Sequence, residues 1–249
     1  MKKSLILFLA LIFLIPSLAF PNIFTFKAGL FIPRAQSDLW TTEFENMSFS
    51  KTNYTTTNFG FAYEYFLTRE ASLVIGVDSY SKNKFGSYEG LVGFELIDGY
   101  FAFPIEDYEG NFFPVHAFNI SITPIQLSLK LTPMGRTGKF IPYVGGGVGL
   151  YLWNVRLNGD LVDFDDVWVY VPDGIDIYPI TTVDAWESNR ISFGYHAFGG
   201  IMVPFTKRMT FEVEFKYNRA QGELKEAFEG FEPFDLSAYQ ISLGMNYWF

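Results

Sequence analysis

The sequence predicts an all-β protein, an eight-stranded antiparallel up-and-down transmembrane β-barrel with long extracellular loops. Three observations predict it. Apolar and polar residues alternate through segment after segment, which is the period of a β-strand with two different faces. One residue in five is aromatic, and beyond the N-terminal segment no stretch approaches the roughly 20 apolar residues of a spanning helix. Short and long connections also alternate between the segments, as in membrane barrels.

The N-terminal segment has the organisation of a secretory signal peptide. Lys2 and Lys3 precede an uncharged run that contains an apolar block at residues 5–14, and Ser17 and Ala19 are small. We expect a signal peptide at residues 1–19 and a barrel domain at residues 20–249. The alternative is an uncleaved membrane anchor, although Pro16 interrupts the apolar block. The chain has no Cys, so neither a lipid anchor on Cys nor a disulfide is expected.

The charge balance excludes one class of partner. Without Lys2 and Lys3, 16 basic residues remain against 27 acidic ones, a net charge of −11. An acidic protein repels the phosphate backbone of nucleic acids, and no basic stripe or basic helix is present in the sequence. No nucleic-acid partner is therefore expected.

Eight segments carry the strand alternation. They are residues 24–32, 57–67, 73–78, 117–131, 140–153, 191–203, 210–218 and 239–249. In the fifth, Gly145, Gly147 and Gly149 take inward positions, where a missing side chain leaves room for bulky neighbours in a narrow barrel. A phosphate-binding glycine loop is the alternative for this run, but the Lys-Ser/Thr pair and the following helix are missing. In the fourth, the apolar positions change phase, which predicts a β-bulge near Thr123 and Pro124.

The connections are long after the first, third, fifth and seventh strands and short after the others. The connection at residues 81–115 contains a predicted hairpin of residues 91–97 and 100–103, with Asp98-Gly99 as a type I′ turn. The connection at residues 156–189 contains a second predicted hairpin, of residues 167–171 and 175–180 around Pro172-Asp173-Gly174. Membrane barrels place short turns on the periplasmic side and long loops outside, so both hairpins are expected outside the membrane.

The C-terminal strand carries a resemblance to a known group of proteins. Ser242, Gly244, Tyr247 and Phe249 resemble the terminal signal by which assembly machinery recognises bacterial outer-membrane barrels. Residues 140–153 and 193–218 resemble the fifth to seventh strands of the outer membrane protein A and outer membrane protein W type barrels. The resemblance implies an outer-membrane location, with outer-membrane lipid and the barrel-assembly machinery as partners. The long loops with their hairpins fit neither subfamily closely. A soluble lipocalin-like barrel is the architectural alternative, but it would have to hide the outward apolar rows.

The strand alternation also predicts which polar residues face the barrel interior. They are Lys27, Glu64, Asp78, Gln126, Lys130, His196, Glu212, Glu214 and Lys216. An eight-stranded barrel is barely wide enough for its own side chains, and buried charges are costly unless they are paired. We therefore expect these residues to pair across the lumen as a plug. The alternative is a hydrophilic channel.

A plugged lumen leaves the external loops to carry function, as surface structure or as an adhesive contact with an extracellular ligand or surface. The alternative function is a channel for small hydrophobic molecules, as the resemblance to outer membrane protein W implies. Phe31, Phe66, Phe118 and Trp248 are the inward or switchable apolar residues that favour it.

An enzyme is not expected. His116 and His196 are the two histidines, and neither a Ser-His-acid pattern nor a metal-binding spacing accompanies them. A second alternative function is a lipid-modifying enzyme, in which His196 beside Glu212 or Glu214 resembles half of the site of lipid A deacylase barrels. The acids of residues 160–166 lack a calcium-binding spacing and are interpreted as a solvated loop. No cofactor or metal is expected.

Overall fold

The computed structural model describes residues 22–249, apart from the side chains of residues 188–190. The predicted signal peptide at residues 1–19, and the first two residues of the predicted barrel domain, lie outside the described residues.

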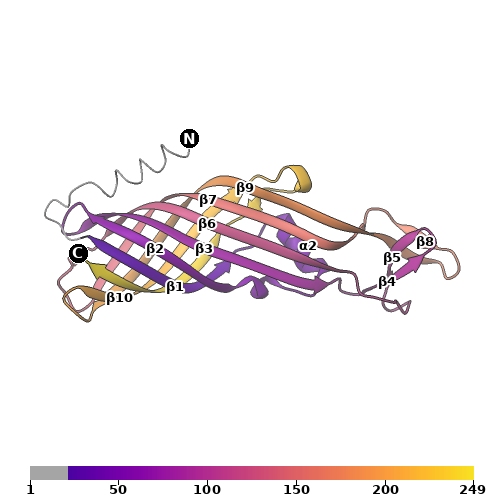
Figure 1. The fold of residues 1–249 in the computed structure, drawn as a ribbon, viewed down its shortest axis with the longest axis horizontal. Helices are drawn as coiled ribbons and strands as arrows, with labels where there is room; N and C mark the ends of the chain where they lie inside the picture. Colours follow the sequence, from indigo (N-terminus) through magenta and orange to yellow (C-terminus); the bar gives the residue numbers. More distant parts are fainter. Residues whose placement is uncertain (1–21) are drawn as a thin grey trace.

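Eight antiparallel strands form a closed barrel, as predicted (Figure 1). They are β1 (Ile23–Pro33), β2 (Thr56–Phe66), β3 (Ala71–Ser87), β6 (Val115–Leu131), β7 (Ile141–Val162), β9 (Ile175–Pro204), β10 (Met209–Gly222) and β12 (Ala238–Trp248). Each pairs with its neighbour in sequence order, and β12 pairs with both β10 and β1. Because the sheet closes on itself, no barrel strand presents a free edge to lipid.

The remaining elements lie in the connections at one end of the barrel. Helix α2 (Asp38–Asn46) and the 3-10 turn η1 (Lys51–Tyr54) follow β1, while η2 (Glu226–Phe228) and β11 (Phe234–Asp235) lie between β10 and β12. Three short strands, β4 (Leu91–Leu96), β5 (Gly99–Pro104) and β8 (Trp168–Tyr170), belong to a distal lobe. Figure 1 shows this lobe at the far end of the molecule from the C-terminus.

Three barrel strands are much longer than the alternation predicted. β3 continues to Ser87, β7 continues to Val162, and β9 begins at Ile175. Much of the predicted loop at residues 156–189 is therefore barrel wall, since residues 155–162 of β7 pair with residues 187–180 of β9. The many aspartates suggested a solvated loop, although alternate residues such as Val155 and Leu157 are buried.

Strand β6 shows that the predicted bulge is wrong. Pairing with β7 runs without a register shift through Thr123 and Pro124, and the even-numbered residues face inward along the whole strand. Below Pro124 the inward residues are polar, and above it they are apolar and buried, ending with Phe118. The apolar positions therefore change phase in the sequence because the outside of the strand changes from lipid to water, and not because the strand bulges. The register shift that does occur lies between Trp153 and Val155, on β7 against β9.

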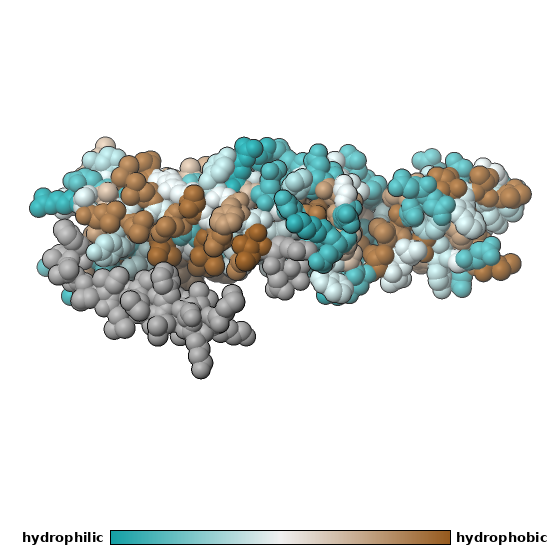
Figure 2. Space-filling view, turned by 90° about the horizontal axis from the view of Figure 1, so that it is seen from above, coloured by the Kyte–Doolittle hydropathy of each residue, from teal (hydrophilic) through white to brown (hydrophobic). Residues whose placement is uncertain are grey.

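The barrel thus has two zones of opposite polarity. In the membrane zone, apolar side chains face outward in rows such as Ile125, Leu127, Leu129 and Leu131, each at least 40% exposed. In the extracellular zone, the outward residues are polar and the apolar ones fill the interior. Figure 2 shows hydrophobic residues over the barrel half near the C-terminus and hydrophilic ones over the middle of the molecule. Exposed rows of this extent fit a lipid-facing belt and not a soluble barrel.

Both predicted hairpins are present, with differences in detail. β4 pairs with β5 from Leu91↔Pro104 to Leu96↔Gly99. A type I′ turn needs a positive φ at two successive residues, and only Gly99 has one here (φ 137°), so that turn type is wrong. In the second hairpin, β8 pairs with the first residues of β9, and Gly174 has the predicted positive φ of 68°.

Two lysine substitutions on the outward face of β6 test the boundary between the zones. Leu127→Lys places a charge in the lipid-facing belt and is expected to lower the free energy of unfolding by about 2–4 kcal/mol. Ser121→Lys, the matched control, faces water above the boundary and is expected to change it by less than about 0.5 kcal/mol. Urea titration of the protein folded in lipid vesicles measures both. Equal effects would contradict the assigned boundary.

Candidate functional site

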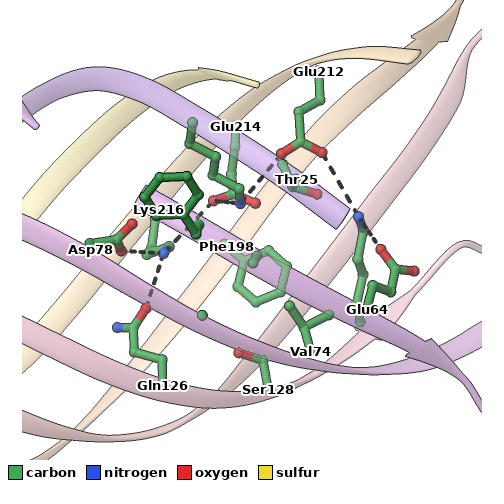
Figure 3. A pocket seen from close by; sticks show the side chains of 15 residues that line it. Thr25, Glu64, Val74, Asp78, Gln126, Ser128, Phe198, Glu212, Glu214 and Lys216 are labelled. Atoms are coloured by element: carbon green, nitrogen blue, oxygen red, sulfur yellow. Dashed lines mark hydrogen bonds and ion pairs between the residues drawn. The ribbon is translucent and has the colours of Figure 1, made fainter. Parts of the chain in front are cut away.

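The interior of the membrane zone is filled by ionic groups that we call the lumen network (Figure 3). All nine predicted inward residues are buried there, each no more than 9% exposed. The charged members are Lys27, Lys130, Lys216 and Arg136, with Glu64, Asp78, Glu212 and Glu214. Four cations therefore face four carboxylates, and the network carries no formal net charge.

Lys27 is the centre of the first part of the network. It extends from β1 to two carboxylates of β10, with Nζ 2.8 Å from Glu214 Oε1 and 3.4 Å from Glu212 Oε1. The hydroxyl of Tyr143 on β7 donates to the other oxygen of Glu214 at 3.1 Å. Opposite walls of the barrel are thus joined through one carboxylate.

Lys130 and Arg136 form the second part, around Glu64 of β2. Lys130 Nζ donates to Glu64 Oε2 at 2.9 Å and lies 4.0 Å from the centre of the Tyr143 ring. Arg136, in the turn after β6, contacts Glu64 Oε1 at 3.0 Å. Sequence reasoning missed Arg136 because a turn residue has no place in a strand alternation. The available signal was the charge of the predicted inward residues, in which four carboxylates face three lysines.

Lys216 forms the third part. Its Nζ lies 2.8 Å from Asp78 Oδ2 and donates to Gln126 Oε1 at 3.0 Å. The Gln126 amide in turn donates to Asn218 Oδ1 at 2.6 Å. Strands β3, β6 and β10, which are not all neighbours in the wall, are therefore connected through the lumen.

His196 takes no part in the ion pairs. Its Nε2 lies 2.7 Å from Ser128 Oγ, and its ring stacks on Phe198. The sequence-based interpretation placed His196 beside Glu212 or Glu214, but Nδ1 has no hydrogen-bond partner among the described residues. Ser128 and His196 therefore lack the acid that orients the histidine in a Ser-His-acid site.

The lumen network leaves little free space. The cavity that it surrounds has a volume of about 30 Å³, lined by residues of the network together with neighbours such as Phe198 and Val74. Such a cavity holds one or two water molecules at most. Gly145 contributes to the tight packing, because a Cβ at this position would lie 2.3 Å from the Phe198 ring.

The interior of the extracellular zone is closed by a second structure, which we call the aromatic plug. Trp40 of α2 is fully buried and donates from Nε1 to the Asp235 carbonyl at 3.1 Å. Its ring stacks on Phe234 at 5.2 Å and meets the edges of Tyr54 and Phe118 at 5.0 and 5.5 Å. The connections after β1 and β10 thus fold into the barrel and fill it from above.

A buried polar contact fixes α2 to the barrel wall. Glu43 Oε2 lies 2.7 Å from His116 Nε2, and His116 Nδ1 lies 3.2 Å from the Asp160 carbonyl. The ring of Tyr88 packs edge-on against His116, and its hydroxyl accepts a hydrogen bond from Val162 N. Burial raises the pKa of Tyr88 to about 12, which keeps this hydroxyl neutral.

The four apolar residues proposed for a hydrophobic channel fall into two separate groups. Phe31 and Phe118 are part of the apolar core of the extracellular zone. Phe66 and Trp248 pack against each other at the other end of the barrel, where the Arg136 guanidinium lies over the Phe66 ring at 3.9 Å. The lumen network separates the groups, so they line no continuous apolar path.

The residues of the predicted assembly signal lie on both faces of β12. Ser242 and Gly244 are buried, and Tyr247 and Phe249 are exposed on the outside, with their rings 5.2 Å apart. A Cβ at Gly244 would lie 2.6 Å from Glu212 Cγ, so this glycine makes room for the lumen network. Recognition by an assembly machinery stays a prediction.

Among the described residues, no three His, Cys, Asp or Glu side chains are close enough together to hold a metal ion. No helix in residues 22–249 is long and apolar enough to cross a membrane.

Comparison with known proteins identifies the fold. No protein-family model and no curated protein sequence matches the chain. The outer membrane protein OprG from Pseudomonas aeruginosa is similar in structure, with a TM-score of 0.50 and 15% identity over 93% of this chain and 96% of that one. Ail of Yersinia pestis, solved with the heparin analogue sucrose octasulfate, has a TM-score of 0.42 and 8% identity over 92% of this chain and 97% of that one. The N-terminal β-barrel domain of Pseudomonas aeruginosa OprF has a TM-score of 0.36 and 11% identity, with the same coverage. The closed eight-stranded barrel and its similarity to OprG give the chain the fold of small outer-membrane barrels, which confirms the predicted fold class and, at the level of fold, the predicted location.

A matched pair of alanine substitutions tests the contribution of the lumen network. Lys130→Ala leaves three buried cations against four carboxylates, with Glu64 held by Arg136 alone and Glu212 by Lys27 alone. The unbalanced buried charge is expected to cost about 3–5 kcal/mol of unfolding free energy. Lys139→Ala removes the same side chain from an exposed turn position and is expected to cost less than about 0.5 kcal/mol. Urea titration in lipid vesicles measures both. If the Lys130 variant were as resistant as the parent protein, the network would not stabilise the barrel.

Proposed function

We propose that this protein is a non-conducting outer-membrane barrel whose extracellular part makes structural or adhesive contacts with an external ligand or surface, and that it is not an enzyme. The observation that carries the proposal is that the lumen is closed twice. The lumen network closes it within the membrane zone, and the aromatic plug closes it again above.

Opening such a lumen is costly for two independent reasons. Separating Lys27 from Glu214 or Lys216 from Asp78 would leave charges unpaired in a barrel interior that holds almost no water, and an unpaired buried charge costs several kcal/mol. Removing Trp40 from the plug would also expose a large aromatic surface. These costs favour a barrel that stays closed over a pore that opens and closes.

The length of the wall supports a contact function. A tilted strand needs about 9–11 residues to cross a bilayer, and β9 has 30 residues. β7 has 22 residues, and most of its upper part pairs with β9. The protein therefore raises a rigid, filled cylinder well above the membrane surface, and the distal lobe is attached to the end of it.

The same arrangement suggests the other partners. The outward rows of the membrane zone are the surface for outer-membrane lipid, and the exposed Tyr247 and Phe249 rings extend that surface to the C-terminus. The terminal strand is the segment for the barrel-assembly machinery.

A second candidate function, passage of small hydrophobic molecules, is favoured by one observation. Pairing between β9 and β10 ends at Gly194↔Ala220, after which β10 pairs with β11. A recess of about 500 Å³ lies there, and Trp153 is part of its lining. The Trp153 ring is buried and packs against Gly222, where a Cβ would lie 2.3 Å from it.

Planar bilayer recording separates the two candidates. The purified full chain, refolded in detergent and inserted into a bilayer, is expected to give no steady single-channel openings, because both closures are part of the folded structure. A porin refolded by the same procedure is the positive control, and a heat-dependent shift on gels shows that the barrel is folded. Steady openings from folded protein would contradict the closed lumen and favour the channel.

A further inference from the structure

The acidic charge of the protein is concentrated in the distal lobe, which we define as residues 89–114 and 163–178. The acidic residues in it are Glu89, Glu95, Asp98, Glu106, Asp107, Glu109, Asp163, Asp165, Asp166, Asp173 and Asp176. These are 11 acids, and the lobe contains no Lys or Arg. The rest of the chain after Lys3 has 16 acidic and 16 basic residues. Without Lys2 and Lys3 of the predicted signal peptide, the net charge of the protein therefore equals the net charge of the lobe.

The distal lobe is an ordered structure and not a solvated loop. Its strands lie in the order β8, β9, β5, β4, and Figure 1 shows them together at the end of the barrel. Val92, Phe101, Phe103 and Ile177 form a buried core that is separate from the core of the barrel. Tyr108 stacks on Phe103 at 4.5 Å and covers this core. The acids are thus held on a folded support.

Strand β8 forms one edge of this sheet, and apolar side chains in it and on either side of it are exposed, while Tyr170 packs on the core of the lobe. It pairs with β9 on one side and with no strand of residues 22–249 on the other. Val167, Trp168, Val169 and Val171 are 51%, 45%, 58% and 86% exposed. Proteins normally protect such an edge by shortening it, or with lysine, proline or a covering segment, because its free backbone groups accept another strand. β8 is three residues long and Pro172 follows it, but neither a lysine nor a paired strand of residues 22–249 lies on this edge, and acids border it.

We infer that the β8 edge binds an extended, basic segment of a partner protein by strand addition. This inference rests on the proposed contact function of the extracellular part and names its partner chemistry. Main-chain hydrogen bonds to the free edge would supply affinity, and apolar side chains of the segment would cover Trp168 and Val169. Its lysines or arginines would lie near Asp165, Asp166 and Asp173, which have no basic residue beside them in the lobe.

Charge excludes the other occupants of the edge. A second copy of this chain would bring a lobe with 11 acids against another with 11 acids, and no cation of the lobe would balance them. Sulfated polysaccharides and anionic membrane surfaces would be repelled in the same way. A basic segment is the occupant whose charge and backbone both match the edge.

The test uses the folded full chain in detergent micelles and a fluorescent peptide of alternating lysine and valine as the probe. We expect saturable binding that weakens as salt is raised. A peptide of alternating glutamate and valine tests the charge requirement, and one of alternating lysine and proline tests the backbone requirement, because proline lacks the N–H of a strand. Neither control peptide is expected to bind as the probe does. Equal binding of the lysine-proline peptide would overturn strand addition.

A matched pair of charge-reversal variants places the binding site. Asp165→Lys with Asp166→Lys is expected to weaken probe binding by about tenfold or more. Glu45→Lys with Glu229→Lys makes the same change in net charge at exposed positions outside the lobe and is expected to weaken it less than about twofold. Equal weakening by both pairs would mean that only overall charge matters, and would overturn the inference.

Hydrogen exchange measured by mass spectrometry gives the readout at the edge itself. Bound probe is expected to slow exchange of the backbone amides in residues 167–171. Protection confined to α2 or to residues 223–236 would place the contact elsewhere and overturn the inference while leaving the proposed contact function intact. Self-association of the protein without probe, with slowed exchange in residues 167–171, would make a second copy the occupant and overturn the inference. Failure of the proposed function would instead appear as steady conductance of the folded barrel.

Discussion

The balance of four buried cations against four buried carboxylates is the constraint on which the rest of the barrel depends. In a narrow barrel whose apolar side chains face lipid, the alternating polar side chains must face the lumen. Those charges are tolerable there only when they are paired and hydrogen-bonded. Lys27, Lys130 and Lys216 satisfy this condition by reaching across to other strands, so the same contacts that neutralise the interior also tie the wall together and close the lumen.

Above the membrane, the barrel wall faces water in place of lipid. The same strands there carry polar residues on the outside and apolar residues on the inside. Water now lies outside, so the outward residues of β6 become Asn119 and Ser121, and the inward ones become apolar. An apolar interior must be filled, and α2 with Trp40 and the segment with Phe234 fill it. One continuous barrel therefore has a lipid-facing part within the membrane and a water-facing part above it. The distal lobe repeats the second solution on a smaller scale, with its own core and an acidic surface.

The strands of the membrane zone could be predicted well from the sequence, because apolar and polar residues alternate along each of them and the apolar side marks the face toward lipid. The nine inward residues and both distal hairpins were therefore identified, the hairpins through Asp98-Gly99 and Pro172-Asp173-Gly174. The bulge predicted near Pro124 was wrong. The geometry of β6 is regular there, but the outside of the strand changes from lipid to water, and this reverses the apolar pattern in the same way that a bulge would. Sequence reasoning also missed α2 and Arg136, since Trp40 lies in a polar stretch and Arg136 in a turn. In both cases the information lies in contacts between distant segments and not in local periodicity.

The two-zone barrel depends most directly on the depth at which β6 leaves the membrane. Because the chain has no Cys, single cysteines introduced at residues 119, 121, 125, 127 and 129 of the outward face can each carry one fluorescent label. Quenching by brominated lipid chains in vesicles then measures the contact of each label with the hydrocarbon. We predict strong quenching at residues 125, 127 and 129 and little at residues 119 and 121, with the change at Thr123 and Pro124. Similar quenching along the whole strand would contradict the two-zone barrel.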